Sequence, residues 1–299
     1  MPSTAPDASA ADAPLAVDAA DLRKTYGSTV AVDGLSLSIP SGTVYGFLGP
    51  NGAGKTTTMR LLTGLSTPTA GSARVCGVSV EDRRALVSRV GYLPETPPLY
   101  DEFTAREQLE YVADLRDLPA AAADDRIEDA LARFDLAGDA DRRIGSYSKG
   151  MRRKTGFVQS ALHDPDVLFL DEPTSGLDPR AARRIRESID AFAERGTTVF
   201  LSTHILPVVE AVADTVGVLF EGRLVAEGTP AEVTERAAAG SGGTLEDAFL
   251  AVTSDVDAAD APGGEGTDAG APGGEGTDAD APSGEGTDAG APDGGGAGR

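Results

Sequence analysis

Short runs of apolar residues alternate along the chain with longer segments in which apolar positions recur every three or four residues. The continuous runs predict strands buried on both faces, and the spaced pattern predicts amphipathic helices. Strands are predicted over residues 41–49, 89–95, 166–173 and 197–204, and helices over 56–65, 104–117, 121–136, 179–196 and 207–214. Strands that alternate with helices in this way predict a largely parallel sheet covered on both faces.

Local signals support two further assignments. Thr104 comes directly before a helical pattern and Glu107 follows three residues later, which is the spacing of a capping box. Two apolar runs within residues 215–230 are separated by Glu221–Gly222, which predicts a hairpin with its turn at those residues.

The two ends of the chain differ from the middle in composition. Beyond residue 254, the repeated units APGGEGTDAG, APGGEGTDAD and APSGEGTDAG consist mostly of Gly, Pro, Asp and Glu. Such a segment has too few apolar residues to bury a core, so we expect residues 254–299 to be a disordered, solvated linker. Residues 1–17 have a similar composition, and we expect a disordered extension there. The ordered domain is therefore predicted over residues 18–253.

The chain is strongly acidic, with 48 Asp and Glu against 26 Lys and Arg among 299 residues. A net charge of -22 makes nucleic acid a poor partner, because nucleic-acid binding requires a basic surface. An acidic surface that uses Arg far more than Lys fits a halophilic protein, since salt screens the repulsion between its charges. An acidic, GC-rich genome would explain the same composition, so both interpretations stay open.

No apolar run in the sequence approaches the ~20 residues of a membrane-spanning helix. The N-terminal residues contain neither a basic stretch nor an apolar run, so we do not expect a secretory signal. The single cysteine, Cys76, excludes an internal disulfide and suits a reducing compartment. These features predict a chain that does not cross a membrane by itself.

A glycine-rich loop lies between the strand predicted over 41–49 and the helix predicted over 56–65. Its sequence, GPNGAGKT from Gly49 to Thr56, matches the phosphate-binding P-loop pattern. Glycines let successive backbone N–H groups surround phosphate oxygens, and the positive end of the following helix adds to the attraction. We expect Lys55 to reach the terminal phosphates and the Thr56 hydroxyl to bind Mg²⁺.

A second motif, LFLDEP, ends the apolar strand predicted over 166–173. Carboxylates at this end of a strand lie where ligands bind in parallel sheets. We expect Asp171 to hold Mg²⁺ and Glu172 to polarise the water that attacks the nucleotide. The alternative is that two acids simply begin a polar loop.

Five motifs occur in an order and at a rough spacing that resemble those of ATP-binding cassette (ABC) ATPases. They are the P-loop, YSKGM at 147–151, LFLDEP at 168–173, SGLD at 175–178 and STH at 202–204. The resemblance covers about residues 17–253. It implies an α/β P-loop NTPase fold with a largely parallel core sheet, a small antiparallel β subdomain and a helical subdomain at about residues 96–160.

The resemblance also implies how a nucleotide is held. Two subunits are expected to form a head-to-tail dimer, in which each ATP lies between the P-loop of one subunit and the YSKGM signature of the other. The nucleotide-binding residues that the family pattern gives are Tyr26, Gly49, Asn51, Gly52, Ala53, Gly54, Lys55, Thr56, Thr57, Ser148, Lys149, Gly150 and Asp178. Tyr26 is expected to stack on adenine, and Asp178 to couple the two sites. His204 is expected to bond the γ-phosphate beside the catalytic Glu172.

Taken alone, Tyr26, His204 and the signature turn each fit an ordinary structural role; their combination favours the ATPase. The motifs also differ from the usual family pattern. Lys149 and Met151 stand where Gly and Gln are common. Glu95 replaces a common Gln, and a carboxylate can bind Mg²⁺ but cannot donate a hydrogen bond unless it is protonated. These variants resemble stand-alone ATPase subunits of exporters of drugs, ions or lipids.

The sequence therefore predicts an ATP-hydrolysing subunit of an ABC exporter with ATP and Mg²⁺ as ligands. It is expected to act as a homodimer or with a paired ABC ATPase subunit, on separately encoded membrane permease subunits. It would then lie at the cytoplasmic face of the cell membrane. The alternative is a soluble ABC ATPase of translation or repair, although such proteins usually carry two cassettes or long coiled-coil insertions. A GTPase is disfavoured, since the chain has no Asn-Lys-x-Asp motif.

Overall fold

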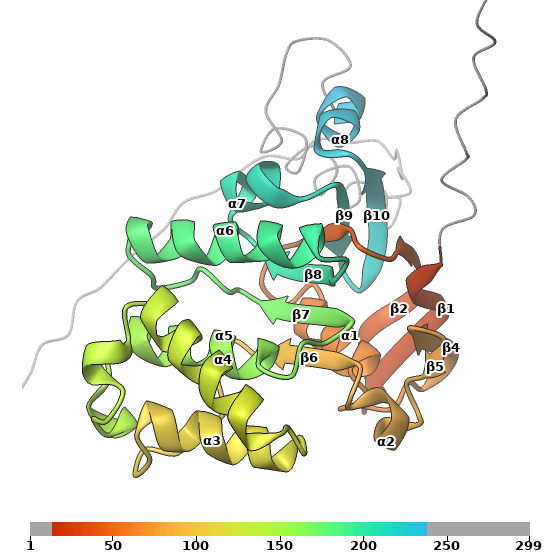
Figure 1. Ribbon diagram of the computed structural model, residues 1–299. Coiled ribbons are helices and arrows are strands. Elements are labelled where there is room, and N and C mark those ends of the chain that lie inside the picture. The colour runs from red at the N-terminus through yellow and green to blue at the C-terminus, as the bar shows by residue number, and fades with distance from the viewer. Residues whose placement is uncertain (1–13, 238–299) are drawn as a thin grey trace, which may run out of the picture. The chain divides into compact units, whose positions relative to one another are not determined.

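A computed structural model of the chain describes residues 14–237. Its centre is a six-stranded sheet in the order β10-β9-β3-β8-β7-β6 (Figure 1). The strands are β3 (Val44–Leu48), β6 (Val90–Leu93), β7 (Val167–Asp171), β8 (Thr198–Thr203), β9 (Thr215–Phe220) and β10 (Arg223–Gly228). All neighbours pair in parallel except β9 and β10, which form the predicted hairpin. The prediction of a largely parallel sheet is confirmed.

The helices include the five amphipathic segments predicted from the sequence. They are α1 (Lys55–Leu62), α2 (Arg83–Leu86), α3 (Ala105–Leu115), α4 (Ala120–Arg133), α5 (Lys149–Ala161), α6 (Pro179–Glu194), α7 (Leu206–Val212) and α8 (Pro230–Ala237), with short 3₁₀ turns η2 (Ala137–Asp139) and η3 (Ile144–Ser146). The predicted capping box of α3 is confirmed, because Thr104 and Glu107 each accept a hydrogen bond from the other's backbone N–H.

The strands of the parallel sheet bury side chains on both faces. On one face, the rings of Phe47 and Phe200 have centroids 5.1 Å apart and belong to one hydrophobic cluster. On the other face, Leu168 and Leu201 belong to a second cluster, formed with helices α3 to α7. Successive side chains of a strand point to opposite faces, so each apolar strand supplies two cores. This two-sided burial explains the continuous apolar runs in the sequence.

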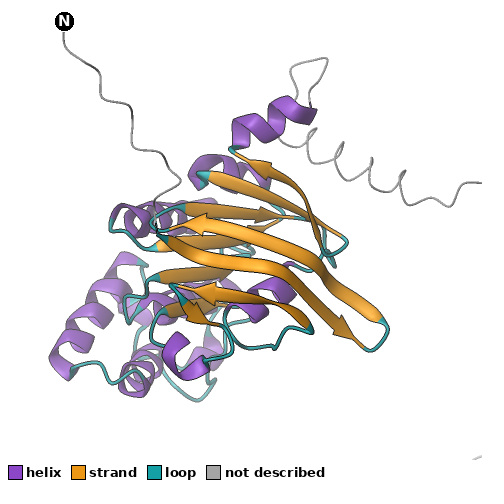
Figure 2. Ribbon diagram, turned by 90° about the vertical axis from the view of Figure 1, so that its right-hand side faces the viewer, coloured by secondary structure: helices purple, strands orange, loops and turns teal. Residues whose placement is uncertain are grey.

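A four-stranded antiparallel sheet covers the aromatic face of the first sheet (Figure 2). Its strands are β1 (Leu15–Tyr26), β2 (Thr29–Pro40), β4 (Ala70–Val75) and β5 (Val78–Ser79), in the order β2-β1-β4-β5. In β2, buried residues alternate with exposed ones from Leu35 to Ile39, which is the pattern of a sheet with one face in the core.

The boundary predicted at residue 18 needs correction. β1 begins at Leu15, and Ala16 and Val17 are buried. Val17 pairs with Ile39 of β2 and with Val75 of β4, so it lies inside the antiparallel sheet. The N-terminal extension is therefore shorter than the 1–17 predicted from composition.

The predicted repeat tail, residues 254–299, lies outside the residues that the structure describes, as does the chain before residue 14. Within residues 14–237, none of the helices combines the length and the apolar character needed to span a bilayer. The helices α3, α4 and α5 fall between residues 105 and 161 and follow one another without an intervening strand.

Candidate functional site

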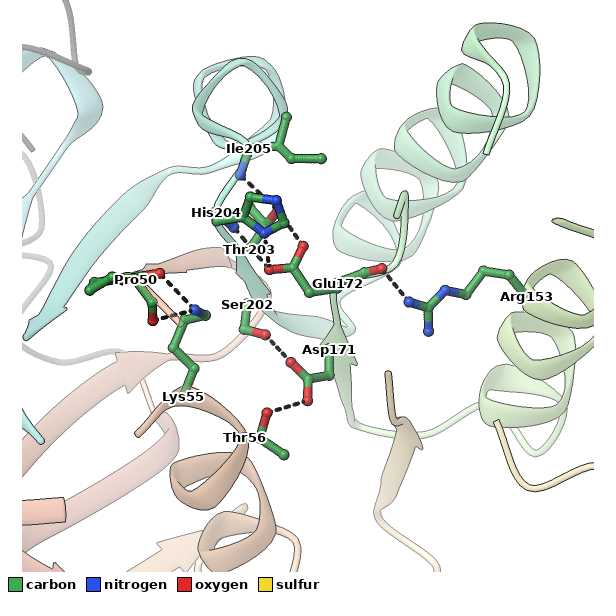
Figure 3. A network of polar contacts seen from close by, with 11 residues as sticks. Pro50, Lys55, Thr56, Arg153, Asp171, Glu172, Ser202, Thr203, His204 and Ile205 are labelled. Carbon is green, nitrogen blue, oxygen red and sulfur yellow. Dashed lines mark hydrogen bonds and ion pairs between the residues drawn. The ribbon is translucent and has the colours of Figure 1, made fainter. Parts of the chain in front are cut away.

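Three neighbouring strands end at one edge of the parallel sheet and bring the predicted site residues together. β3 leads into the P-loop, β7 leads into Glu172, and β8 leads into His204. Because β3, β8 and β7 are adjacent and parallel, their carboxyl ends lie side by side. Figure 3 shows the resulting group, which we call the P-loop cluster: Lys55, Thr56, Asp171, Glu172, Ser202, Thr203 and His204.

The P-loop requires glycine at two positions for steric reasons. A Cβ at Gly49 would lie 2.5 Å from the carbonyl oxygen of Leu219, and a Cβ at Gly54 would lie 2.3 Å from that of Ala31. Gly54 also has a φ of 107°, which residues with a side chain rarely adopt, and it is the last residue before α1. Close backbone packing therefore fixes the path of the loop.

The other loop residues of the predicted site differ in exposure. Asn51 and Gly52 are exposed, Ala53 is buried and Thr57 is half-buried. A Cβ at Gly52 would meet no atom within 4 Å, so its φ of 88° is the reason for glycine there. Gly222, in the β9–β10 turn, donates its N–H to the carbonyl of Ala53 at 2.9 Å and so anchors the loop from outside.

Lys55 is buried although it is charged. Its ammonium group donates hydrogen bonds to the carbonyl oxygens of Gly49 at 2.6 Å and Pro50 at 3.0 Å. Burial lowers the pKa of Lys55, while the negative charges of nearby carboxylates, with Glu172 first, oppose that shift. The loop therefore holds a cation at the position where the sequence predicts the terminal phosphates.

Asp171 connects α1 to β8. Its Oδ2 accepts a hydrogen bond from the Thr56 hydroxyl at 2.8 Å, and its Oδ1 accepts one from the Ser202 hydroxyl. Two of the three residues predicted to bind Mg²⁺, Thr56 and Asp171, are thus in direct contact. The third, Glu95, has an exposed position on the loop after β6.

Glu172 is oriented by the end of β8 and the residue that follows it. Its Oε1 accepts a hydrogen bond from the backbone N–H of His204 at 3.0 Å and lies 2.7 Å from Nδ1 of the same residue. Its Oε2 accepts a hydrogen bond from the Thr203 hydroxyl at 3.0 Å. A carboxylate that faces Nδ1 favours a proton on that nitrogen and fixes the ring with Nε2 directed away from Glu172. The His204 side chain is 54% exposed, so this second nitrogen is accessible.

Sequence reasoning missed one residue of this site, Arg153 on α5. Its guanidinium is buried and donates hydrogen bonds to the carbonyl oxygens of Pro94, Glu95 and Glu172. In the sequence, a cation within a polar stretch of helix predicts a surface residue. The signal available was spacing, because Arg153 lies four residues before Phe157 and therefore on the buried face of the helix.

Tyr26 ends β1 and is 49% exposed. The ammonium group of Lys24 lies 5.0 Å from the centroid of its ring and donates a hydrogen bond to the carbonyl of Thr67 at 2.8 Å. A cation on one face of an aromatic ring leaves the other face for a stacked partner. Tyr26 therefore has the exposure that stacking on a base requires.

The residues Ser148–Gly150, which we call the signature segment, form a separate group. Ser148 is the N-cap of α5, and its hydroxyl accepts a 3.2 Å hydrogen bond from the backbone of the first turn. The Lys149 side chain passes beside Gly176, and Gly150 faces Leu177, both in the loop before α6. Within residues 14–237, no hydrogen bond joins the signature segment to the P-loop cluster.

Asp178 begins α6. Its Oδ1 accepts hydrogen bonds from the backbone N–H groups of Arg180 and Ala181, both at 3.0 Å. These bonds, with that from Ala181 first, lower the pKa of Asp178. The carboxylate thus caps a helix, and coupling between two sites stays a prediction.

Comparison with known proteins agrees with this geometry. The family profile described as "ABC transporter" matches residues 32–175. The chain is 42% identical over 224 residues to the daunorubicin resistance ATP-binding protein DrrA3 of Streptomyces coeruleorubidus, an alignment that covers 75% of this chain and 70% of that protein. The chain belongs to the ABC transporter ATP-binding family.

A second relative and a solved structure agree with this membership. This ABC ATPase is 40% identical over 220 residues to the Nod factor export ATP-binding protein I of Burkholderia orbicola. The alignment covers 73% of this chain and 72% of that protein. A solved ATP-binding subunit of an ABC transporter aligns with a TM-score of 0.74 at 29% identity, over 79% of this chain and 99% of that one. The predicted P-loop NTPase fold, ATP as nucleotide and ATP hydrolysis as activity are confirmed at the level of the family.

Proposed function

We propose that this ABC ATPase powers the export of a drug, an ion or a lipid through separately encoded membrane permease subunits. Two copies, or one copy and a paired ATPase subunit, close around two ATP molecules at the cytoplasmic face of the membrane. The relatives named for daunorubicin resistance and for Nod factor export support the direction of transport. The names of these relatives do not favour the alternative of a soluble ATPase of translation or repair.

The observation that carries the proposal is the P-loop cluster itself. In the assignment we propose, the backbone of Gly49–Gly54 and the ammonium group of Lys55 bind the phosphates. Glu172 accepts the proton of the attacking water, because it is the carboxylate that three groups of Thr203 and His204 hold in one orientation. His204, held through Nδ1, presents Nε2 to the terminal phosphate.

The residues of the cluster also fit Mg²⁺. This ion takes oxygen ligands, usually one or two carboxylates together with substrate phosphates and waters. Thr56 and Asp171 offer two such oxygens in contact, and we assign Glu95 as a more distant contributor. Residues 14–237 hold no group of three or more His, Cys, Asp or Glu that could hold a metal ion by themselves. When bound, the ion would supply positive charge to the phosphate oxygens.

The remaining assigned residues belong to the outer parts of the site. We assign Tyr26 to stacking on adenine, and Ser148, Lys149 and Gly150 to the ATP held by the other subunit. Ser148 and Lys149 are exposed, which supports a role toward a second chain. We assign Asp178 to the coupling of the two sites.

Purification from the membranes of the source cells, with partner subunits retained, tests the proposal. We expect the chain to copurify in stoichiometric amount with a permease that has several apolar spans of ~20 residues. We also expect the ATPase activity of that complex to be sensitive to vanadate and to respond to the transported molecule. Full activity in a chain recovered free of any permease would contradict a role in transport.

A further inference from the structure

Arg153 is a cation buried inside the protein without a carboxylate in hydrogen-bond contact among residues 14–237. Its side chain is 2% exposed. The guanidinium donates to the carbonyl oxygens of Pro94 at 2.9 Å and Glu95 at 2.7 Å. It also donates to the carbonyl oxygen of Glu172 at 2.7 Å (Figure 3). Burying a charge is costly unless hydrogen bonds replace the lost water, and these three bonds do so. A buried Arg retained at such a cost points to a task that a neutral residue would not perform.

The three carbonyls belong to two loops at the carboxyl edge of the sheet. Pro94 and Glu95 follow β6, and Glu172 follows β7, its parallel neighbour. The same helix touches the first loop again at Gly156, where a Cβ would lie 2.5 Å from Pro97. α5 is therefore fastened to both loops, and Arg153 is the side chain that joins them.

The backbone of Glu172 has an unfavourable conformation that hydrogen bonds must hold in place. Its φ of 51° lies in the left-handed region, which is unfavourable for a residue with a side chain. Its N–H donates to the carbonyl of Ser202 at 2.9 Å, and its carbonyl accepts from Arg153. The two peptide groups that flank its Cα are thus held from opposite sides, which fixes the direction of its carboxylate.

We propose that Arg153 is a positioning residue for ATP hydrolysis, which makes the orientation of Glu172 depend on the position of α5. Ser148 and Arg153 are five residues apart in one helix, so they lie about 8 Å apart along its axis and move together. This inference rests on the proposed function, in which Ser148 faces the ATP of the other subunit. Closure of the signature segment over that ATP would then fix the positions of the two loops that carry Glu95 and Glu172 in its own subunit.

Variants at position 153 test the inference, with position 152 as the matched control. Arg153→Gln removes the charge and the fork of donors, while Arg153→Lys keeps the charge but not the fork. We expect kcat to fall about 10- to 100-fold in Arg153→Gln, as for a misplaced catalytic group, and less in Arg153→Lys. The Kd for ATP, measured in a binding assay, should change little. The Hill coefficient for ATP should also fall toward one.

Arg152→Gln removes the same charge one residue earlier, where the partly exposed side chain pairs with Asp101 and donates to the carbonyl of Ile144, away from the Glu95 and Glu172 loops. It should leave kcat, Kd and the Hill coefficient close to those of the wild type. If Arg153→Gln does not fold, Arg153→Lys carries the test alone. A kcat and Hill coefficient at the wild-type level in the folded position-153 variants would overturn the inference, as would an equal loss in Arg152→Gln.

Glu172→Gln separates this inference from the proposed function. If Glu172→Gln abolishes turnover while the folded position-153 variants hydrolyse ATP cooperatively at the wild-type rate, the inference on Arg153 fails and the catalytic assignment stands. If Glu172→Gln itself hydrolyses ATP normally, the assignment of Glu172 fails, and the inference on Arg153 fails with it.

Discussion

The P-loop cluster and the signature segment are both polar, but their hydrogen bonds reach very different distances along the chain. In the P-loop cluster, Thr56 bonds to Asp171, 115 residues away, and Thr203 bonds to Glu172, 31 residues away. In the signature segment, the one hydrogen bond that the Ser148 hydroxyl makes within residues 14–237 is to the backbone three residues ahead. The first group is held by the sheet and the second by one helix end.

This difference shows that the two groups are held in place in different ways. Parallel strands set the P-loop cluster in place before any ligand arrives, since the polar groups already orient one another. The signature segment instead presents Ser148 and Lys149 to solvent at the positive end of α5. In the proposed assignment a complete phosphate site needs both kinds of group, and the exposure of Ser148 and Lys149 fits a role toward the nucleotide of another chain.

The largest expected effect lies inside the P-loop cluster. Glu172→Gln removes the proposed base but leaves its size and the Lys55 contacts, so kcat should fall about 10²- to 10⁴-fold while ATP affinity is retained. Single-turnover hydrolysis and equilibrium binding measure the two separately. Glu187→Gln on α6, where the exposed carboxylate pairs with Arg183 at 2.8 Å, is the control and should hydrolyse normally. Normal hydrolysis in Glu172→Gln would remove it as the base.

The next effect separates binding from chemistry within the same cluster. Lys55→Ala removes a buried charge next to the P-loop carbonyls, and the loss of a charge-assisted hydrogen bond should weaken ATP binding about 10- to 100-fold. Calorimetry with a non-hydrolysable ATP analogue measures the change. Arg183→Ala removes a charge at the surface and should bind as the wild type does. Unchanged affinity in Lys55→Ala would contradict the P-loop assignment.

The third prediction addresses the signature segment by comparing two helix caps. Ser148→Ala and Thr104→Ala each remove an N-cap hydroxyl, at α5 and at α3, and each should lower stability by about 1 kcal/mol. Only Ser148→Ala should also reduce ATP turnover, because only its hydroxyl is assigned to a phosphate. Thermal unfolding and steady-state ATPase assays give the two quantities. Equal turnover in the two variants would break the distinction between the regions.

The smallest effect lies away from both regions. Nε2 of His163 donates a hydrogen bond to the carbonyl of Val90 at 3.0 Å, and burial lowers the pKa of His163 to about 4. Between about pH 6.5 and 4 the unfolded state binds a proton that the folded state does not, so stability is lost as the pH falls through this window. The loss should be about 1–2 kcal/mol, allowing for the partial exposure of the ring.

His163→Gln keeps a donor for Val90 but does not titrate. Urea unfolding of both proteins at pH 7 and pH 4.5 isolates the contribution of the histidine from that of the carboxylates. The wild type should lose more stability than His163→Gln over this interval. Equal losses would show that His163 is not buried in its neutral form.

The strands and the P-loop could be predicted because their signals are local. The runs around Phe47 and Phe169 are apolar throughout, since both faces of the parallel sheet are buried. The antiparallel sheet was expected only from the family resemblance. The register of its strand β1 shifts several times, and Asp21 has a φ of 49°, so the alternation of buried and exposed residues is interrupted.

Arg153 shows why part of the site could not be predicted. Its three carbonyl partners lie 59, 58 and 19 residues away in sequence, and backbone carbonyls carry no residue identity that a motif could reveal. The contact between Thr56 and Asp171 spans even more of the chain, 115 residues, but both residues lie in motifs that act on the same ligand. Side chains that bind the ligand leave a sequence pattern, whereas those that hold the backbone depend on the fold.

Sedimentation velocity with ATP and Mg²⁺ tests most directly whether the nucleotide site needs two copies of the chain. Glu172→Gln, which retains ATP, should sediment as a dimer. The same variant carrying Ser148→Arg should bind ATP with unchanged affinity but sediment as a monomer. A Glu172→Gln protein that stays monomeric with ATP bound, or a double variant that dimerises as readily, would contradict the account.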